Sequence, residues 1–168
     1  MAGSGAPTLN LDGAGLRITI VSASWHDEIL GGLNAGARRA LEAAGVEYDE
    51  IRVAGSFELP VVCQAALEAG ADAVVAIGVI LRGETPHFDY ISDAATTGLT
   101  QVTLQTGKPV GFGVLTIDTE QQGLDRAGLP GSKEDVGAEA AQAAIDSALT
   151  LRALAARGAG APAGFSAR

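Results

Sequence analysis

The sequence AVVAIGVILRGETPHFDY, residues 73–90, decides the fold. Its first nine residues, Ala73 to Leu81, contain no polar side chain and show no alternation, which predicts a strand buried on both faces. Gly83 ends this strand. Thr85 is expected to cap the following helix, and Pro86 to occupy its first position. The stretch therefore predicts a central strand, a glycine turn and a helix in close succession.

The turn in this stretch is a candidate anion site. Backbone N–H groups at a helix N-terminus point outward, with the positive end of the helix dipole behind them, which suits a phosphate. His87, one of two histidines in the chain, is expected in the first helical turn, within reach of a bound group. An ordinary strand–helix connection with a surface histidine explains the local pattern equally well.

Strands and helices alternate along the rest of the chain. The predicted strands are residues 16–22, 48–53, 73–81 and 110–118. The predicted helices are residues 27–44, 60–70, 86–106, 119–127 and 133–156. Asp27 and Thr119 are the expected N-caps of the first and fourth helices. This alternation predicts an α/β fold with a parallel sheet, and a ligand site at the carboxyl ends of its strands.

We expect a single domain at residues 16–157. Residues 1–15, rich in glycine and alanine, are expected to be flexible, although residues 8–11 are a candidate edge strand. Residues 158–168 are expected to form a disordered tail. A chain of 168 residues is long enough to bury one sizeable core.

Composition limits the classes of partner. The net charge of −9 argues against nonspecific binding to nucleic acid or to an anionic membrane surface. The single cysteine, Cys63, forms no internal disulfide and has no neighbours that resemble metal ligands. No apolar run is long enough to span a membrane. We therefore expect a cytoplasmic protein without a resident metal or cofactor.

Several polar and aromatic residues follow predicted strand ends, so one rim of the sheet would collect them. Trp25 either stacks on a flat ligand or anchors packing. Glu58 either accepts hydrogen bonds from a ligand or caps its own helix. His26 is expected to be solvated, and Arg126 is an ordinary surface cation unless a phosphate lies near it. Phosphate-loop, dinucleotide and Gly-x-Ser-x-Gly motifs are absent from the positions at which they would be functional.

Four motifs together resemble the lumazine synthase family of riboflavin biosynthesis. They are GSFELP at 55–60, GVI-x-RG-x-T-x-HF-x-Y at 78–90, GVLT at 113–116 and RAG at 126–128. The resemblance extends from about Leu16 to Ala156. It implies a flavodoxin-like three-layer fold with a central parallel sheet, assembled as pentamers. It also implies condensation of 5-amino-6-(D-ribitylamino)uracil with 3,4-dihydroxy-2-butanone 4-phosphate, giving 6,7-dimethyl-8-ribityllumazine, phosphate and water.

The resemblance also implies a role for each motif residue, with His87 as the acid/base. The implied pyrimidine and ribityl ligands are Trp25, Ser56, Phe57, Glu58, Val79, Ile80, Leu81 and Phe112. The implied phosphate ligands are Gly83, Glu84, Thr85 and Arg126. Phe112 and Arg126 match residues that a neighbouring subunit supplies. Glu84 fits only if its amide binds and its carboxylate points away. A lysine usual in the family is Val136 here, and Lys133 is the candidate replacement.

Assembly and alternative functions are separate expectations. The linker at 128–136 contains Pro130 and is longer than the tight connection associated with shell-forming relatives, so we expect isolated pentamers instead of shells of twelve pentamers. The resemblance names riboflavin synthase as a candidate partner. The alternatives on the same fold are a lumazine or flavin carrier without catalytic activity, and a shell protein. Retention of both His87 and Arg126 argues against a carrier.

Overall fold

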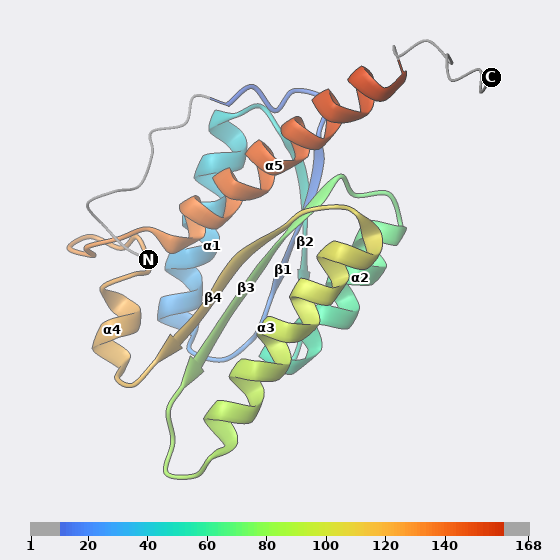
Figure 1. Ribbon diagram of the computed structural model, residues 1–168. Coiled ribbons are helices and arrows are strands. Elements are labelled where there is room, and N and C mark those ends of the chain that lie inside the picture. Colours follow the sequence, from blue (N-terminus) through green and yellow to red (C-terminus); the bar gives the residue numbers. More distant parts are fainter. Residues whose placement is uncertain (1–10, 160–168) are drawn as a thin grey trace.

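The computed structural model of the chain describes residues 11–159, which form a four-stranded sheet covered by helices on both faces (Figure 1). The strands are β1 Arg17–Ser22, β2 Glu47–Arg52, β3 Ala73–Leu81 and β4 Val110–Ile117. The helices are α1 Asp27–Ala43, the short 3₁₀ helix η1 Ser56–Glu58, α2 Leu59–Glu68, α3 His87–Thr106, α4 Glu120–Leu124 and α5 Val136–Ala159. The predicted edge strand, except for its last residue, and most of the predicted terminal segments lie outside the described residues.

The sheet is parallel throughout, with the order β2-β1-β3-β4. This is the order of a doubly wound, flavodoxin-like sheet, whose connections change direction between β1 and β3. Figure 1 shows α1 and α5 on one face of the sheet and α2 and α3 on the other. The predicted α/β fold with a central parallel sheet is confirmed, and the crevice between the ends of β1 and β3 is where such folds bind ligands.

The central strand is buried on both faces, as its lack of alternation predicted. Every residue of β3 except Leu81 is buried. Val75 and Ile77 pack in the cluster beneath α1 and α5, whereas Val74 and Ala76 pack in the cluster beneath α2 and α3. Since successive strand residues face opposite layers, both layers need an apolar side chain from β3.

Two predicted N-caps are wrong: Asp27 is the first residue of α1 instead of its cap, and Thr85 does not cap α3. Helix α1 begins at Asp27, and the residue before it, His26, turns the chain with a φ of 67°. Helix α3 begins at His87 after Pro86, whose φ is −63°, so Thr85 lies outside the helix and does not cap it. Thr119, in contrast, accepts a hydrogen bond from the amide of Gln122 and caps α4 as predicted.

The last helix begins later than predicted, and the segment before it explains why. The amides of Lys133 and Glu134 donate to the carbonyl oxygen of Asp125, at 2.7 and 3.0 Å. These bonds hold the segment against the end of α4, which itself stops at Leu124 instead of continuing to residue 127. Helix α5 therefore begins at Val136, three residues later than predicted from the sequence. Within residues 11–159, no helix is both long and apolar enough to cross a membrane.

Helices α1 and α5 approach each other closely at Gly137, in the first turn of α5. A Cβ atom built on Gly137 would overlap the backbone carbonyl of Leu33 in α1. We expect Gly137→Ala to lower the free energy of unfolding by about 2–3 kcal/mol, because the two backbones must separate. Urea unfolding at equilibrium measures this. The control is Gly158→Ala, where an added Cβ would meet nothing within 4 Å. Equal effects of the two substitutions would contradict the close approach.

Candidate active site at the carboxyl edge of the sheet

A cavity of about 410 Å³ lies where β1 and β3 end, at the expected crevice. It gathers nine of the residues singled out from the sequence: Trp25, Ser56, Phe57, Val79, Ile80, Leu81, Gly83, Thr85 and His87. These residues come from the loop after β1, from η1, from the end of β3 and from the turn into α3. The fold thus brings together segments that lie up to 62 positions apart, counted from Trp25 to His87.

Two aromatic rings border the cavity without being buried in the core. Trp25 is 67% exposed and Phe57 is 60% exposed. Exposure of this extent contradicts the interpretation of Trp25 as a packing anchor. Large apolar rings left in water beside a cavity are typical of a site that binds a flat apolar surface.

Ser56 provides a polar group beside these rings. The residue is only 7% exposed, and its hydroxyl has no hydrogen-bond partner among the described residues. Buried hydroxyls are normally paired, so this enclosed and unpaired oxygen in the cavity wall is unusual. The Ser56 hydroxyl fits here because residue 78 in β3 is a glycine. A Cβ atom at Gly78 would lie only 2.6 Å from Ser56 Oγ and would clash with it.

The turn between β3 and α3 forms the other side of the cavity. Gly83, Thr85 and His87 line it, and His87 is the exposed first residue of α3. Glu84 is exposed and is not among the lining residues. The loop therefore combines a helix N-terminus with an accessible imidazole, as an anion site with a proton-transfer group requires.

Besides Glu84, four of the candidate residues do not line this cavity. Glu58 Oε2 accepts a hydrogen bond from the amide of Gly55 at 2.8 Å, so its carboxylate helps to close its own 3₁₀ turn. Phe112 lies on the edge strand β4 and is 43% exposed. Lys133 Nζ pairs with Asp125 Oδ2 at 2.5 Å.

Arg126 is the fourth residue outside the cavity. Its Nη1 donates to the carbonyl oxygen of Gln122 at 2.9 Å, and its Nε lies 3.8 Å from Glu134 Oε2. Among the residues that line the cavity in one chain, none is an arginine or a lysine. An anion held there by a single chain would meet only backbone amides and neutral or titratable side chains.

Sequence reasoning did not assign four other lining residues, namely His26, Gly55, Phe88 and Ile91. Ile91 lies one helical turn after His87, so the spacing i, i+4 would have placed it on the same face. His26 was expected to be solvated, but it is partly buried at the cavity wall. Its left-handed backbone, which directs it there, has no clear signature in a single sequence.

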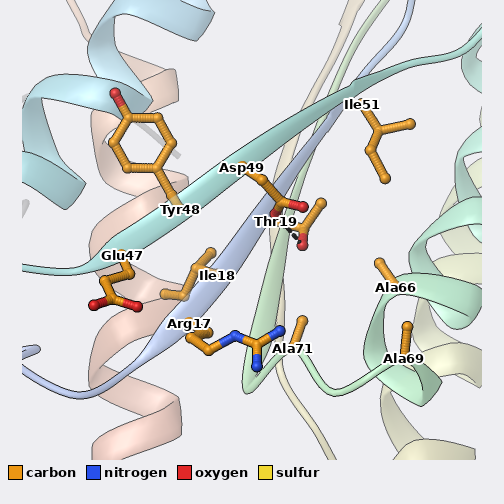
Figure 2. A pocket seen from close by; sticks show the side chains of 10 residues that line it. All are labelled: Arg17, Ile18, Thr19, Glu47, Tyr48, Asp49, Ile51, Ala66, Ala69 and Ala71. Carbon is orange, nitrogen blue, oxygen red and sulfur yellow. Dashed lines mark hydrogen bonds between the residues drawn. The ribbon is translucent and has the colours of Figure 1, made fainter.

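A second hollow lies beside the edge strand β2 (Figure 2). It is lined near the amino ends of β1 and β2 by residues such as Arg17 and Glu47. The Thr19 hydroxyl donates to Asp49 at 2.6 Å across its floor. Ligands of doubly wound sheets bind at the opposite, carboxyl ends, so this hollow is not the candidate site.

Other chemistries lack support in the described part of the chain. Burial raises the pKa of the Cys63 thiol to about 12, so this side chain is not a nucleophile at neutral pH. Over residues 11–159, no group of three or more histidine, cysteine, aspartate or glutamate side chains is arranged to hold a metal ion.

Comparisons with known proteins agree with the geometry. The profile of the family described as 6,7-dimethyl-8-ribityllumazine synthase matches residues 15–152. A protein of that name from Clavibacter michiganensis subsp. michiganensis is 68% identical over 157 residues, covering 92% of this chain and 98% of the relative. One from Leifsonia xyli subsp. xyli is 67% identical over 92% of this chain and 99% of its own length. One from Kineococcus radiotolerans is 60% identical, again over 92% of this chain and 97% of its own length. The chain therefore belongs to the 6,7-dimethyl-8-ribityllumazine synthase family.

Proposed function

We propose that this protein condenses 5-amino-6-(D-ribitylamino)uracil with 3,4-dihydroxy-2-butanone 4-phosphate. The products are 6,7-dimethyl-8-ribityllumazine, phosphate and water. The observation that carries the proposal is the single cavity into which nine of the expected site residues converge. It joins an aromatic surface, an unpaired hydroxyl, a helix N-terminus and an imidazole, which suit a heterocycle, a polyol, a phosphate and a proton transfer respectively.

The two substrates occupy different parts of the cavity in this proposal. The pyrimidine stacks on Trp25, and the backbone of residues 79–81 hydrogen-bonds to its edge. The ribityl chain lies along the turn at 55–58, of which Gly55, Ser56 and Phe57 line the cavity. The phosphate lies against the amides of residues 83–85, at the positive end of the α3 dipole.

The reaction then needs little beyond position and proton transfer. The aromatic amine attacks the ketone, and water leaves as the imine forms. Loss of the proton at the neighbouring carbinol carbon lets phosphate depart by β-elimination, and the enol that results tautomerises to a new carbonyl at that carbon. The ribityl-bearing amine attacks this carbonyl and closes the ring with loss of a second water. Holding both reactants in attack geometry supplies much of the rate. The His87 imidazole moves the protons, a contribution typically worth about 10²–10⁴-fold.

We further propose that each site is completed by a neighbouring subunit in a pentamer. Phe112 and Arg126 lie outside the cavity of their own chain, and Phe112 exposes its ring on the open edge of the sheet. A head-to-tail contact that repeats around a closed ring gives every site one set of such residues. Arg126 then adds the cation that the cavity of one chain lacks.

Assembly beyond the pentamer follows from the segment before α5. This segment is held to the end of α4 by the bonds to Asp125, and it contains Pro130. We propose that it obstructs contacts between pentamers, so that isolated pentamers form. Sedimentation of the purified protein should give the mass of five chains, and a particle of sixty chains would contradict this. Riboflavin synthase, which would consume the lumazine, is the proposed partner enzyme.

The activity assay tests the proposed function directly. The purified protein is mixed with both substrates, while lumazine absorbance and released phosphate are followed together. We expect the two products in equal amounts. Tight lumazine binding without turnover would contradict the enzyme hypothesis and support the carrier hypothesis. Absence of both binding and turnover would contradict both hypotheses and leave the shell protein.

The Trp25 ring provides a prediction for substrate binding. Trp25→Ala should raise KM for the pyrimidine about 10-fold, because stacking of a base on an aromatic ring contributes on the order of 1–3 kcal/mol. Steady-state kinetics with the phosphorylated substrate at saturation measures this. Trp25→Phe, which keeps a flat ring, should recover most of the affinity. An unchanged KM in Trp25→Ala would refute the stacking role.

A further inference from the structure

We propose that Arg82 is a positioning residue for the phosphate loop, residues 83–86. Its guanidinium connects the two ends of the loop and neutralises aspartates on both sides. This inference rests on the proposed function, because it assumes that the loop holds the phosphate. Arg82 itself does not line the cavity.

The Arg82 side chain contacts residues at two elements, β4 and α3. Its Nε donates to Asp118 Oδ1 at 2.6 Å, just after β4. Its Nη1 lies 3.4 Å from Asp89 Oδ1, in the first turn of α3. Its Cζ lies 4.0 Å from the centre of the Phe88 ring. One side chain thus joins the end of β4 to the start of α3.

These contacts hold the residue before the loop, Arg82, against the residues that follow it in α3. Residues 83–86 begin next to Arg82 and lead into His87 and Phe88. The Arg82 amide also donates to the Ile117 carbonyl at 2.9 Å, which holds the first end of the loop on the sheet. Phe88 lines the cavity beside His87, so the guanidinium on its ring helps to fix the first turn of α3. The loop amides and the imidazole are therefore held in one arrangement.

Charge gives Arg82 a second effect on the loop. Asp89, Asp118 and the loop's own Glu84 bring three carboxylates to a segment that must accept a phosphate. Arg82 contacts two of them. The hydrogen bond that the guanidinium donates to Asp118 raises the pKa of Arg82 above its ordinary value, so the cation persists at any working pH. Without Arg82, the carboxylates of Asp89 and Asp118 would be uncompensated negative charges close to the loop and would disfavour an anion there.

Arg82→Met tests the inference. We expect KM for 3,4-dihydroxy-2-butanone 4-phosphate to rise about 5- to 10-fold, as unit charges several ångströms away at a solvated surface predict. KM for the pyrimidine should change by less than about 2-fold, since the pyrimidine contacts lie elsewhere in the cavity. Calorimetric titration with inorganic phosphate should show the same rise in Kd, whether or not turnover is measured.

Arg38 offers a matched control. Its guanidinium makes a forked pair with Glu50, at 2.6 and 2.8 Å, and is 41% exposed, compared with 46% for Arg82. Neither Arg38 nor Glu50 lines the cavity. Arg38→Met should therefore lose an equivalent ion pair with no change in either KM. Equal effects of the two substitutions would reduce Arg82 to a general structural role and overturn the proposal.

Charge rescue gives the decisive comparison. Adding Asp89→Asn and Asp118→Asn to Arg82→Met removes the carboxylates that Arg82 neutralises, so phosphate affinity should return to within about 3-fold of the wild type. No recovery would overturn the neutralising effect. If the wild type turns over and binds phosphate, but Arg82→Met changes neither KM nor Kd, the positioning role is wrong. If the wild type shows no turnover, the proposed function fails, while the phosphate titration still decides the role of Arg82.

Discussion

Arg126→Ala is expected to lower kcat/KM for the phosphorylated substrate by about 10²–10³-fold. In the proposed site, the guanidinium binds the phosphate and stabilises its charge as it leaves. Removing a single preorganised donor from a developing anion costs this much in other enzymes. One Arg126 nitrogen is already bonded to the carbonyl oxygen of Gln122 in the preceding helix α4, which fixes the side chain before substrate arrives. KM for the pyrimidine should change little.

Arg39→Ala is the control for Arg126. Arg39 Nη2 pairs with Asp135 Oδ2 at 2.7 Å, between α1 and the start of α5, and is more than half exposed. Its loss removes an arginine near the same loop without removing a proposed phosphate contact, so kcat/KM should stay within about 2-fold. A loss in Arg126→Ala that falls only on pyrimidine binding would contradict the phosphate role.

His87→Ala should lower kcat by about 10²-fold without abolishing the reaction. The imidazole lines the cavity as the first residue of α3, next to the loop that is proposed to hold the phosphate. General acid–base catalysis typically contributes 10²–10⁴-fold, whereas the proximity of the two reactants survives the substitution. Steady-state kinetics at saturating concentrations of both substrates measures the residual rate. Complete loss in a variant that still binds both substrates would show that His87 does more than transfer protons.

The sheet could be predicted closely because burial leaves a direct signature. The β3 segment lacks alternation since both of its faces are covered, and its predicted bounds match the structure. Helix boundaries were less predictable. Threonine is a favoured N-cap residue, so Thr85 was expected to cap the helix. The helix instead begins at His87, directly after Pro86, whose ring fixes its φ angle. Residue preferences for helix ends do not show which backbone amides form hydrogen bonds with distant parts of the chain.

The sequence predicted which residues would cluster at the site, but not the individual contacts that they make. Parallel strands place their carboxyl ends on one rim, so the clustering of Trp25, Ser56 and His87 follows from topology. The individual hydrogen bonds do not. Lys133 appeared free to replace a missing lysine, but it pairs with Asp125 eight residues earlier. Arg82 reaches Asp118 across 36 positions, a distance at which one sequence carries no pairing signal.

Reassembly of mixed rings tests the central claim, an active site built from two chains. His87→Ala and Arg126→Ala chains are unfolded together, refolded in equal amounts and checked for mixed rings by native mass spectrometry. Random cyclic mixing leaves roughly a quarter of the contacts with an intact His87 facing an intact Arg126. Activity should therefore rise from the parental level towards a quarter of the wild type. Mixed rings with only parental activity would mean that each chain holds a complete site of its own.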